Sequence, residues 1–196
     1  MKFGIVYSSL TGCTKRVAEA LYAGLDQLKA YPEISQIEKS IDNFRNKPDV
    51  SDADIVALGY FVSQASMEDD LKKFLPNLKG KRVFVFCTLA YFAESEHAFK
   101  SIQSGVNLVK AAGAEVIGSY VCNGALAPDI IARFKSIAES KMEENWPMHH
   151  HHAFTPEKGL RYELFKNHPT KLECELASER FNERVILSEK ILNLHK

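Results

Sequence analysis

Hydroxyl side chains gather around one glycine near the start of the chain. The group consists of Ser8, Ser9, Thr11, Gly12 and Thr14. It lies between an apolar run over residues 3–7 and a helical pattern of apolar residues that continues to residue 28. A loop between a strand and a helix directs backbone N–H groups and hydroxyls to one point, beside the positive end of the helix dipole. The pattern therefore indicates a phosphate-binding loop, although a threonine N-cap beside a glycine turn has the same pattern.

Short apolar runs alternate with helical patterns over the first 145 residues. We expect strands at Phe3–Tyr7, 34–41, Ile55–Gly59, Val83–Cys87 and Val116–Val121. We expect helices at Thr14–Leu28, Glu68–Leu75, His97–Ala112 and Pro128–Asn145. Runs of Val, Ile and Phe suit strands that are covered on both faces, and their alternation with helices is typical of a parallel sheet. The sequence predicts an α/β fold, a three-layer doubly wound five-stranded parallel sheet in the order 2-1-3-4-5.

Pairs of aromatic residues follow the third and fourth predicted strands. The carboxyl ends of parallel strands share one edge of the sheet, so these loops are expected to meet the hydroxyl loop there. One such pair would usually be core packing, but two pairs at the same edge indicate groups that flank a planar ring. The residues expected to hold the ring are Tyr60, Phe61, Val62 and Ser63 in one loop, and Thr88, Leu89, Ala90, Tyr91 and Phe92 in the other. Tyr91 is the residue that we expect to stack on the ring.

The spacing Ser9-x-Thr11-Gly12-x-Thr14 resembles the phosphate loop of flavodoxins, and the resemblance covers about residues 2–145. It implies that the cofactor is FMN. Its phosphate would be held by Ser9, Leu10, Thr11, Gly12, Cys13 and Thr14. Four shorter motifs resemble a flavodoxin subgroup that is associated with bilirubin-reductase systems in gut bacteria. They are Thr88-Leu89, Ser95-Glu96-His97-Ala98, Cys122-Asn123-Gly124 and His168-Pro169.

The charge of the chain is balanced, with 25 Lys and Arg residues against 25 Asp and Glu residues. No strong field attracts it to nucleic acid or to an anionic membrane, and we expect neither as a partner. Flavodoxins are usually markedly acidic, so this chain departs from the family in the charge that steers it to redox partners. We expect an electron carrier that passes reducing equivalents to a partner enzyme, an unidentified reductase. The alternatives are a flavin-dependent reductase that acts directly on a small substrate, and an accessory protein with weak or no flavin binding.

The four cysteines are far apart in the sequence, which favours free thiols and a cytoplasmic location. Leu10-Thr11-Gly12-Cys13 matches a lipoprotein cleavage box, but the apolar run before it is shorter than the ~7–15 residues of an export signal. No Walker A motif, G-x-G-x-x-G fingerprint or Cys-x5-Arg phosphatase loop occurs, and we assign no catalytic residue and no metal ligand.

The character of the sequence changes after residue 145. We expect residues 1–145 to form the flavodoxin-like domain and residues 146–196 to form an arm and a C-terminal helix that packs on the same domain. The tract His149–His152 could bind a metal, but a solvated arm or the remainder of a purification tag is the simpler interpretation. The final segment shows apolar residues at helical spacing, and it is too short to bury a core of its own.

Overall fold

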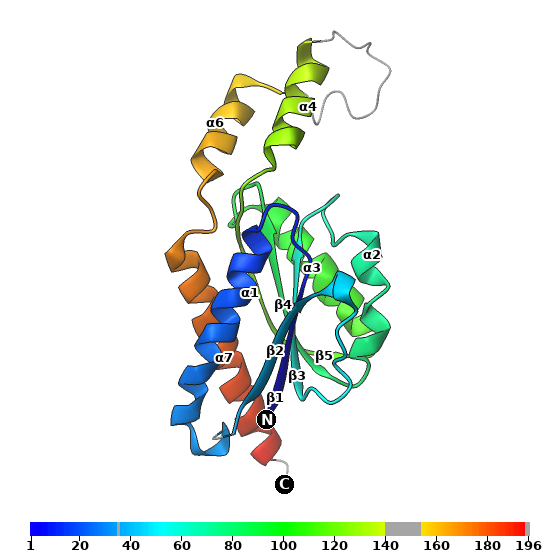
Figure 1. Ribbon diagram of the computed structural model, residues 1–196, viewed down its shortest axis with the longest axis vertical. Coiled ribbons are helices and arrows are strands. Elements are labelled where there is room, and N and C mark those ends of the chain that lie inside the picture. The colour runs from blue at the N-terminus through cyan, green and yellow to red at the C-terminus, as the bar shows by residue number, and fades with distance from the viewer. Residues whose placement is uncertain (35, 140–153, 195–196) are drawn as a thin grey trace.

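The fold is a three-layer sandwich around a parallel sheet (Figure 1), seen in a computed structural model that describes residues 1–34, 36–139 and 154–194. The strands are β1 (Lys2–Tyr7), β2 (Glu38–Asn43), β3 (Ile55–Phe61), β4 (Arg82–Leu89) and β5 (Glu115–Asn123). The described pairings between these five strands are parallel, in the order β2-β1-β3-β4-β5. The predicted fold class and strand order are confirmed. The second strand lies slightly later than its predicted range.

Helices cover both faces of the sheet (Figure 1). On one face lie α1 (Cys13–Gly24) and α7 (Lys171–Leu194), and on the other lie α2 (Asp69–Lys72) and α3 (Glu96–Ala111). Short 3-10 segments complete the connections at Leu25–Ala30, Pro32–Ile34, Phe44–Asn46 and Leu75–Leu78. None of the helices in the described ranges is long and apolar enough to cross a membrane.

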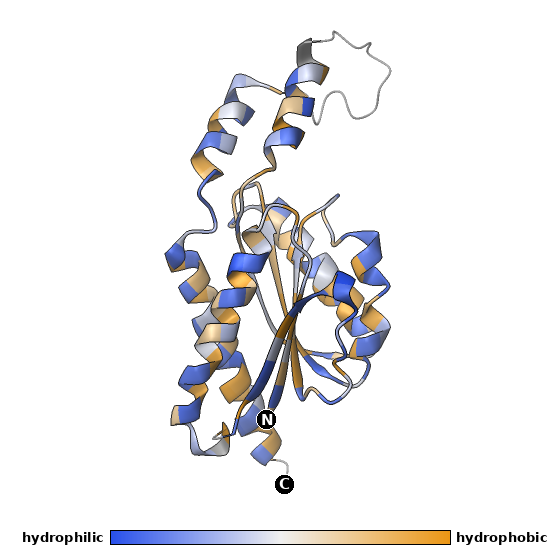
Figure 2. Cartoon of the chain, in the orientation of Figure 1, coloured by the Kyte–Doolittle hydropathy of each residue, from blue (hydrophilic) through white to orange (hydrophobic). Residues whose placement is uncertain are grey.

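Alternate residues of the central strands enter two separate core clusters, as the period of two in a strand requires. In β3, Ile55 and Ala57 face α1 and α7, whereas Val56, Leu58 and Tyr60 face α2 and α3. The central strands are correspondingly apolar along much of their length (Figure 2). Burial on both faces explains why these central strands are apolar runs without polar alternation.

The C-terminal helix α7 covers the sheet beside α1. Its Phe181 is fully buried, with its ring centroid 6.3 Å from that of Phe3 and 5.0 Å from that of Phe84. Ala177 and Val185 are fully buried on the same side of the helix. The packing of α7 against the sheet agrees with the expected C-terminal helix.

A doubly wound fold would place the helix after β5 on a face of the sheet. In the structure this helix does not cover the sheet. Helix α4 (Pro128–Glu139) instead leaves the carboxyl edge of the sheet and runs beside α6 (Pro156–Phe165). Figure 1 shows these two helices projecting beyond the other elements. We call the described residues 128–139 and 154–165 the arm. The expected end of the fourth helix at residue 145 and the tract His149–His152 lie outside the described residues.

Candidate functional site

The loops of the site meet where the strand order reverses. Strand β1 leads into α1 on one face of the sheet, whereas the adjacent β3 leads into α2 on the other, so their loops separate and leave a crevice at the carboxyl edge. A cavity of about 60 Å³ lies there. It is lined by Leu10, Thr11, Phe61, Val62, Thr88, Leu89, Ala90, Gly124, Ala125, Leu126 and Ala127. The structure thus brings together the three predicted loops and adds a fourth, residues 124–127.

The fourth loop was missed because its residues carry no side chain with distinctive chemistry. The signal that could have identified it was its position, since it directly follows β5 and the carboxyl ends of all parallel strands share one edge. The main chain fixes it beside the other loops. Gly124 N donates to Leu89 O at 2.8 Å, and Val62 N donates to Thr88 O at 2.9 Å, which joins the loops after β3, β4 and β5.

The loop before α1 presents unused backbone donors. Within the described ranges, the N–H groups of residues 10–14 donate to no protein acceptor, whereas the next N–H, that of Lys15, donates to Ser9 Oγ at 3.3 Å. Gly12 precedes the helix with φ +85°, and a Cβ at this position would meet no atom within 4 Å. Adjacent free N–H groups at the start of a 12-residue helix fit a phosphate group. The loop before α1 therefore has the backbone donors that a phosphate group would need.

Two threonine hydroxyls that were expected in the site face the protein interior. Thr14 is fully buried and Thr88 is 3% exposed, and their Oγ1 atoms lie 2.9 Å apart, as donor and acceptor to each other. The hydroxyl of Thr11 points to Cys13 Sγ at 3.0 Å. The hydroxyl of Thr14, which was expected to hold the phosphate, is instead bonded to Thr88 in the interior and joins α1 to β4. Thr88, which was expected beside the ring, does line the cavity.

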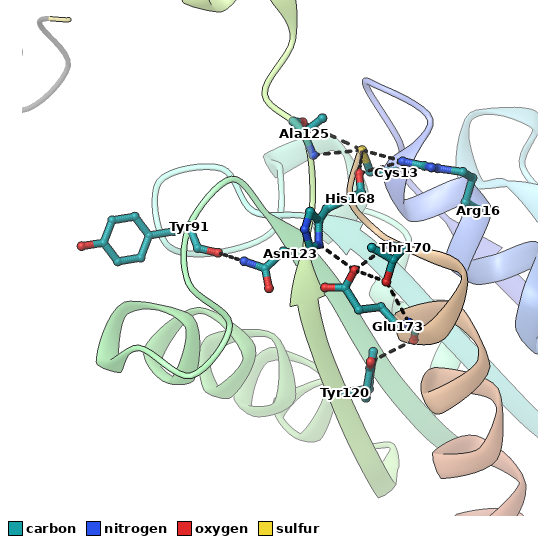
Figure 3. Close-up of polar contacts among 9 residues, drawn as sticks. All are labelled: Cys13, Arg16, Tyr91, Tyr120, Asn123, Ala125, His168, Thr170 and Glu173. Carbon is teal, nitrogen blue, oxygen red and sulfur yellow. Dashed lines mark hydrogen bonds and ion pairs between the residues drawn. The ribbon is translucent and has the colours of Figure 1, made fainter. Parts of the chain in front are cut away.

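The thiol of Cys13 points toward Ala125 and toward His168, which lies between α6 and α7 (Figure 3). It is 3% exposed, accepts from Ala125 N at 3.3 Å and donates to the carbonyl oxygen of His168 at 3.3 Å. Arg16 donates to the same carbonyl oxygen at 2.7 Å. Below this point, Glu173 accepts from Thr170 N at 2.6 Å and lies 2.7 Å from His168 Nδ1. The backbone of Cys13 therefore belongs to the candidate site, while its sulfur contacts the segments that precede and follow the arm.

Tyr60 does not flank a ring site, so this prediction is wrong for its side chain. The ring is fully buried between the sheet and α3, and its hydroxyl donates to Ser101 O at 2.7 Å. A Cβ at Gly105 would lie 2.4 Å from the Tyr60 hydroxyl, which shows how closely the ring approaches α3. Burial raises the pKa of Tyr60, and burial also raises the pKa of the neighbouring Cys87 thiol to about 12. Both are neutral core groups.

Tyr91 and Phe92 contact the arm and are absent from the cavity wall. The guanidinium of Arg161 covers the Tyr91 ring at 4.5 Å from its centroid, and the ring points away from Cys13 and Ala125 (Figure 3). The Phe92 ring lies 5.2 Å from that of Phe165. The structure does not bring Tyr91, the expected stacking residue, to the cavity, because Arg161 of α6 covers its ring. Phe61, Leu89 and Ala90, all predicted, do line the cavity.

Comparison with known proteins agrees with the fold. A family model described as a flavodoxin domain matches residues 4–182. The flavodoxin-like domain-containing protein BilS of Clostridioides difficile is 28% identical over 137 residues, which are 70% of this chain and 74% of the relative.

Two solved structures share the fold. Oxidised flavodoxin 1 from Bacillus cereus superposes with a TM-score of 0.50 at 16% identity, over 66% of this chain and 88% of that one. The flavodiiron core of Flv1 from Synechocystis superposes with a TM-score of 0.59 at 12% identity, over 97% of this chain and 36% of that much longer one. Because the family match extends from β1 into α7, this chain belongs to the flavodoxin family, whose members are flavin-binding electron-transfer proteins with FMN as their cofactor.

Proposed function

We propose that this protein binds FMN at the carboxyl edge of the sheet and passes reducing equivalents to a partner enzyme. The observation that carries the proposal is the row of free backbone N–H groups over residues 10–14, in front of α1. A phosphate placed there would accept several hydrogen bonds and lie at the positive end of the helix dipole. Side-chain hydroxyls contribute less than the resemblance implied, because those of Thr11 and Thr14 already have protein partners.

The ring of FMN would lie in the cavity between the loops. Leu10, which is 65% exposed, and Phe61 would contact it from different loops, with Val62, Leu89 and Ala90 as further apolar surface. Ser63 lies beside this surface, where its N–H and carbonyl groups form a tight turn with Ser66 at 2.8 and 3.0 Å. FMN supplies the electron chemistry when bound, and the chain binds and orients it and limits the access of water.

We propose that the partner is a reductase that does not require a strongly acidic electron carrier for docking, because this chain has no net charge. We also propose a reducing, cytoplasmic setting, since all four cysteines are free thiols. Turnover of NADH or NADPH by the purified protein alone would favour the alternative, a reductase that acts directly on a small substrate. A colourless protein that does not quench FMN fluorescence would favour an accessory role without flavin.

Calorimetric titration of the flavin-free protein with FMN and with riboflavin tests the central step. Hydrogen bonds to a charged group contribute about 1.5–3 kcal/mol each. If the loop forms two such hydrogen bonds with the phosphate, FMN should bind at least about 100-fold more tightly than riboflavin, which has no phosphate. Equal affinities for the two flavins would contradict the phosphate assignment.

A further inference from the structure

The arm encloses a second and larger cavity of about 380 Å³, which lies between α4 and α6. Its floor includes Thr11, Ala125 and Leu126, and its walls come from both helices and from Phe154. Cavities of this size that combine apolar walls with a few polar groups are typical sites for small molecules.

The walls of this arm cavity suit a flat apolar body. Phe154 and Tyr162 lie on one side with their ring centroids 6.4 Å apart, and Ile131 lines the cavity from α4. Gly159 allows this arrangement, because a Cβ there would lie 2.6 Å from Cζ of Phe154. A glycine inside a helix costs about 1 kcal/mol relative to alanine. Here it lets an aromatic ring lie directly against α6.

The charged residues that line the arm cavity are two lysines and one glutamate, so they carry one excess positive charge. Glu163 and Lys166 line the cavity and form an ion pair with each other. Lys135 lines it from α4, with its ammonium group 5.1 Å from the centroid of the Phe154 ring. Among the side chains that the structure describes, no carboxylate lies within ion-pair distance of Lys135. An anionic group on a bound molecule would supply the missing partner.

The arm cavity adjoins the candidate flavin site. Thr11, Ala125 and Leu126 line both cavities, so a molecule in the arm would lie against the loops that surround the flavin. The existence of the arm cavity does not depend on FMN, whereas its position beside a flavin rests on the function proposed above.

We propose that the cavity between α4 and α6 binds a small aromatic anion, with its ring system between Ile131 and the Phe154–Tyr162 wall and its acidic group at Lys135. Such a molecule would lie beside the flavin, in the position of a ligand or substrate of the loaded protein.

Two fluorescent probes with the same ring system test the proposal. One is 8-anilinonaphthalene-1-sulfonate, which is anionic, and the other is N-phenyl-1-naphthylamine, its neutral counterpart. We expect the anionic probe to bind with a stoichiometry of one and at least fivefold more tightly than the neutral probe. Lys135→Gln should lower the affinity for the anionic probe at least fivefold and leave the affinity for the neutral probe unchanged. Ile131→Trp, which fills the cavity, should lower the affinity for both probes at least tenfold.

Lys72→Gln is the matched control, because Lys72 is a lysine on α2 that pairs with Asp69 and does not line the arm cavity. It should change neither affinity. Thermal melting of every variant separates loss of the site from loss of folding. Equal effects of Lys135→Gln and Lys72→Gln, or binding of several probe molecules per folded chain, would overturn the proposal.

FMN titration of the same samples keeps the two proposals distinguishable. Normal FMN binding together with no saturable probe binding would overturn the arm site alone. Saturable probe binding that depends on Lys135, in a protein that does not bind FMN, would support the arm site and contradict the proposed function.

Discussion

The hydroxyl oxygens of Thr14 and Thr88 lie 2.9 Å apart, in the interior between the first turn of α1 and the end of β4. Each hydroxyl is the hydrogen-bond partner of the other, so this contact links two of the loops that form the site. It also means that a substitution of either threonine acts first on the folding of the site.

Replacing Thr14 or Thr88 with valine therefore tests an interior hydrogen bond. Each single variant leaves one buried hydroxyl unpaired, and we expect the free energy of unfolding to fall by about 1–3 kcal/mol. The double variant should lose less than the sum of the two, because it leaves no unpaired group. Urea denaturation measures all four proteins. Strict additivity would show that the two hydroxyls do not interact.

Gly12→Ala tests the phosphate loop without introducing a steric clash. The residue has φ +85° and no atom within 4 Å of a Cβ, so the substitution acts only through backbone strain. Strain of about 1–2 kcal/mol should draw the loop away from the conformation that directs its N–H groups to one point, and lower FMN affinity by about tenfold.

Gly80→Ala is the control for this variant, because Gly80 also has a positive φ, +74°, and open space around a Cβ, but lies outside the site. It should lower stability by a similar amount and leave FMN affinity, measured by fluorescence quenching, unchanged. The same loss of affinity in both variants would mean that the Gly12 loop has no specific role.

The contact of α7 with α1 can be tested at Gly24. A Cβ there would lie 1.7 Å from Ser178 Oγ, and Asn182 Nδ2 donates to Gly24 O at 2.9 Å. Gly24→Ala should therefore lower the free energy of unfolding by about 1–3 kcal/mol, as overpacking does.

Ser178→Ala provides the matched rescue of Gly24→Ala. Its hydroxyl is buried and has no hydrogen-bond partner among the described residues, so its removal alone should cost little. The double variant should recover part of the lost stability in thermal or urea denaturation. No recovery would place the origin of the defect elsewhere in the helix pair.

Ala65→Gly should stabilise the protein. Gln64 and Ala65 have φ of +50° and +59° in the turn between Ser63 and Ser66, a conformation that glycine adopts without strain. We expect a gain of about 1 kcal/mol in the free energy of unfolding. Ala20→Gly, inside α1, is the control and should lose about 1 kcal/mol. A loss in both variants would contradict the assignment of strain to this turn.

Local patterns in the sequence determined the sheet and the phosphate loop. The apolar runs predict strands that are buried on both faces, and the group around Gly12 predicts a turn before α1, because both depend on neighbouring residues and on one backbone conformation. The carboxyl-edge rule then brings the loops after β1, β3 and β4 together without knowledge of any long-range contact.

Side-chain direction was harder to predict, because it depends on where a strand ends. The predicted third strand stopped at Gly59, whereas β3 continues to Phe61. The period of two then places Tyr60 in the core with Val56 and Leu58, and leaves Phe61 at the crevice. This alternation is visible in the sequence. Extending the strand by two residues, however, moves Tyr60 from the expected loop into the core and leaves only Phe61 of the aromatic pair at the crevice.

Only the tertiary structure decided the roles of the C-terminal helices. Both α4 and α7 have apolar residues at helical spacing, and nothing local distinguishes a helix that covers a sheet from one that forms an arm. The choice depends on long-range contacts. Phe181 packs against Phe3 and Phe84. The missing side chain of Gly24 allows α7 to approach α1 closely. With that face covered by α7, α4 runs instead beside α6 beyond the sheet. There, Arg161 covers the Tyr91 ring, and Phe165 makes an edge-on contact with Phe92.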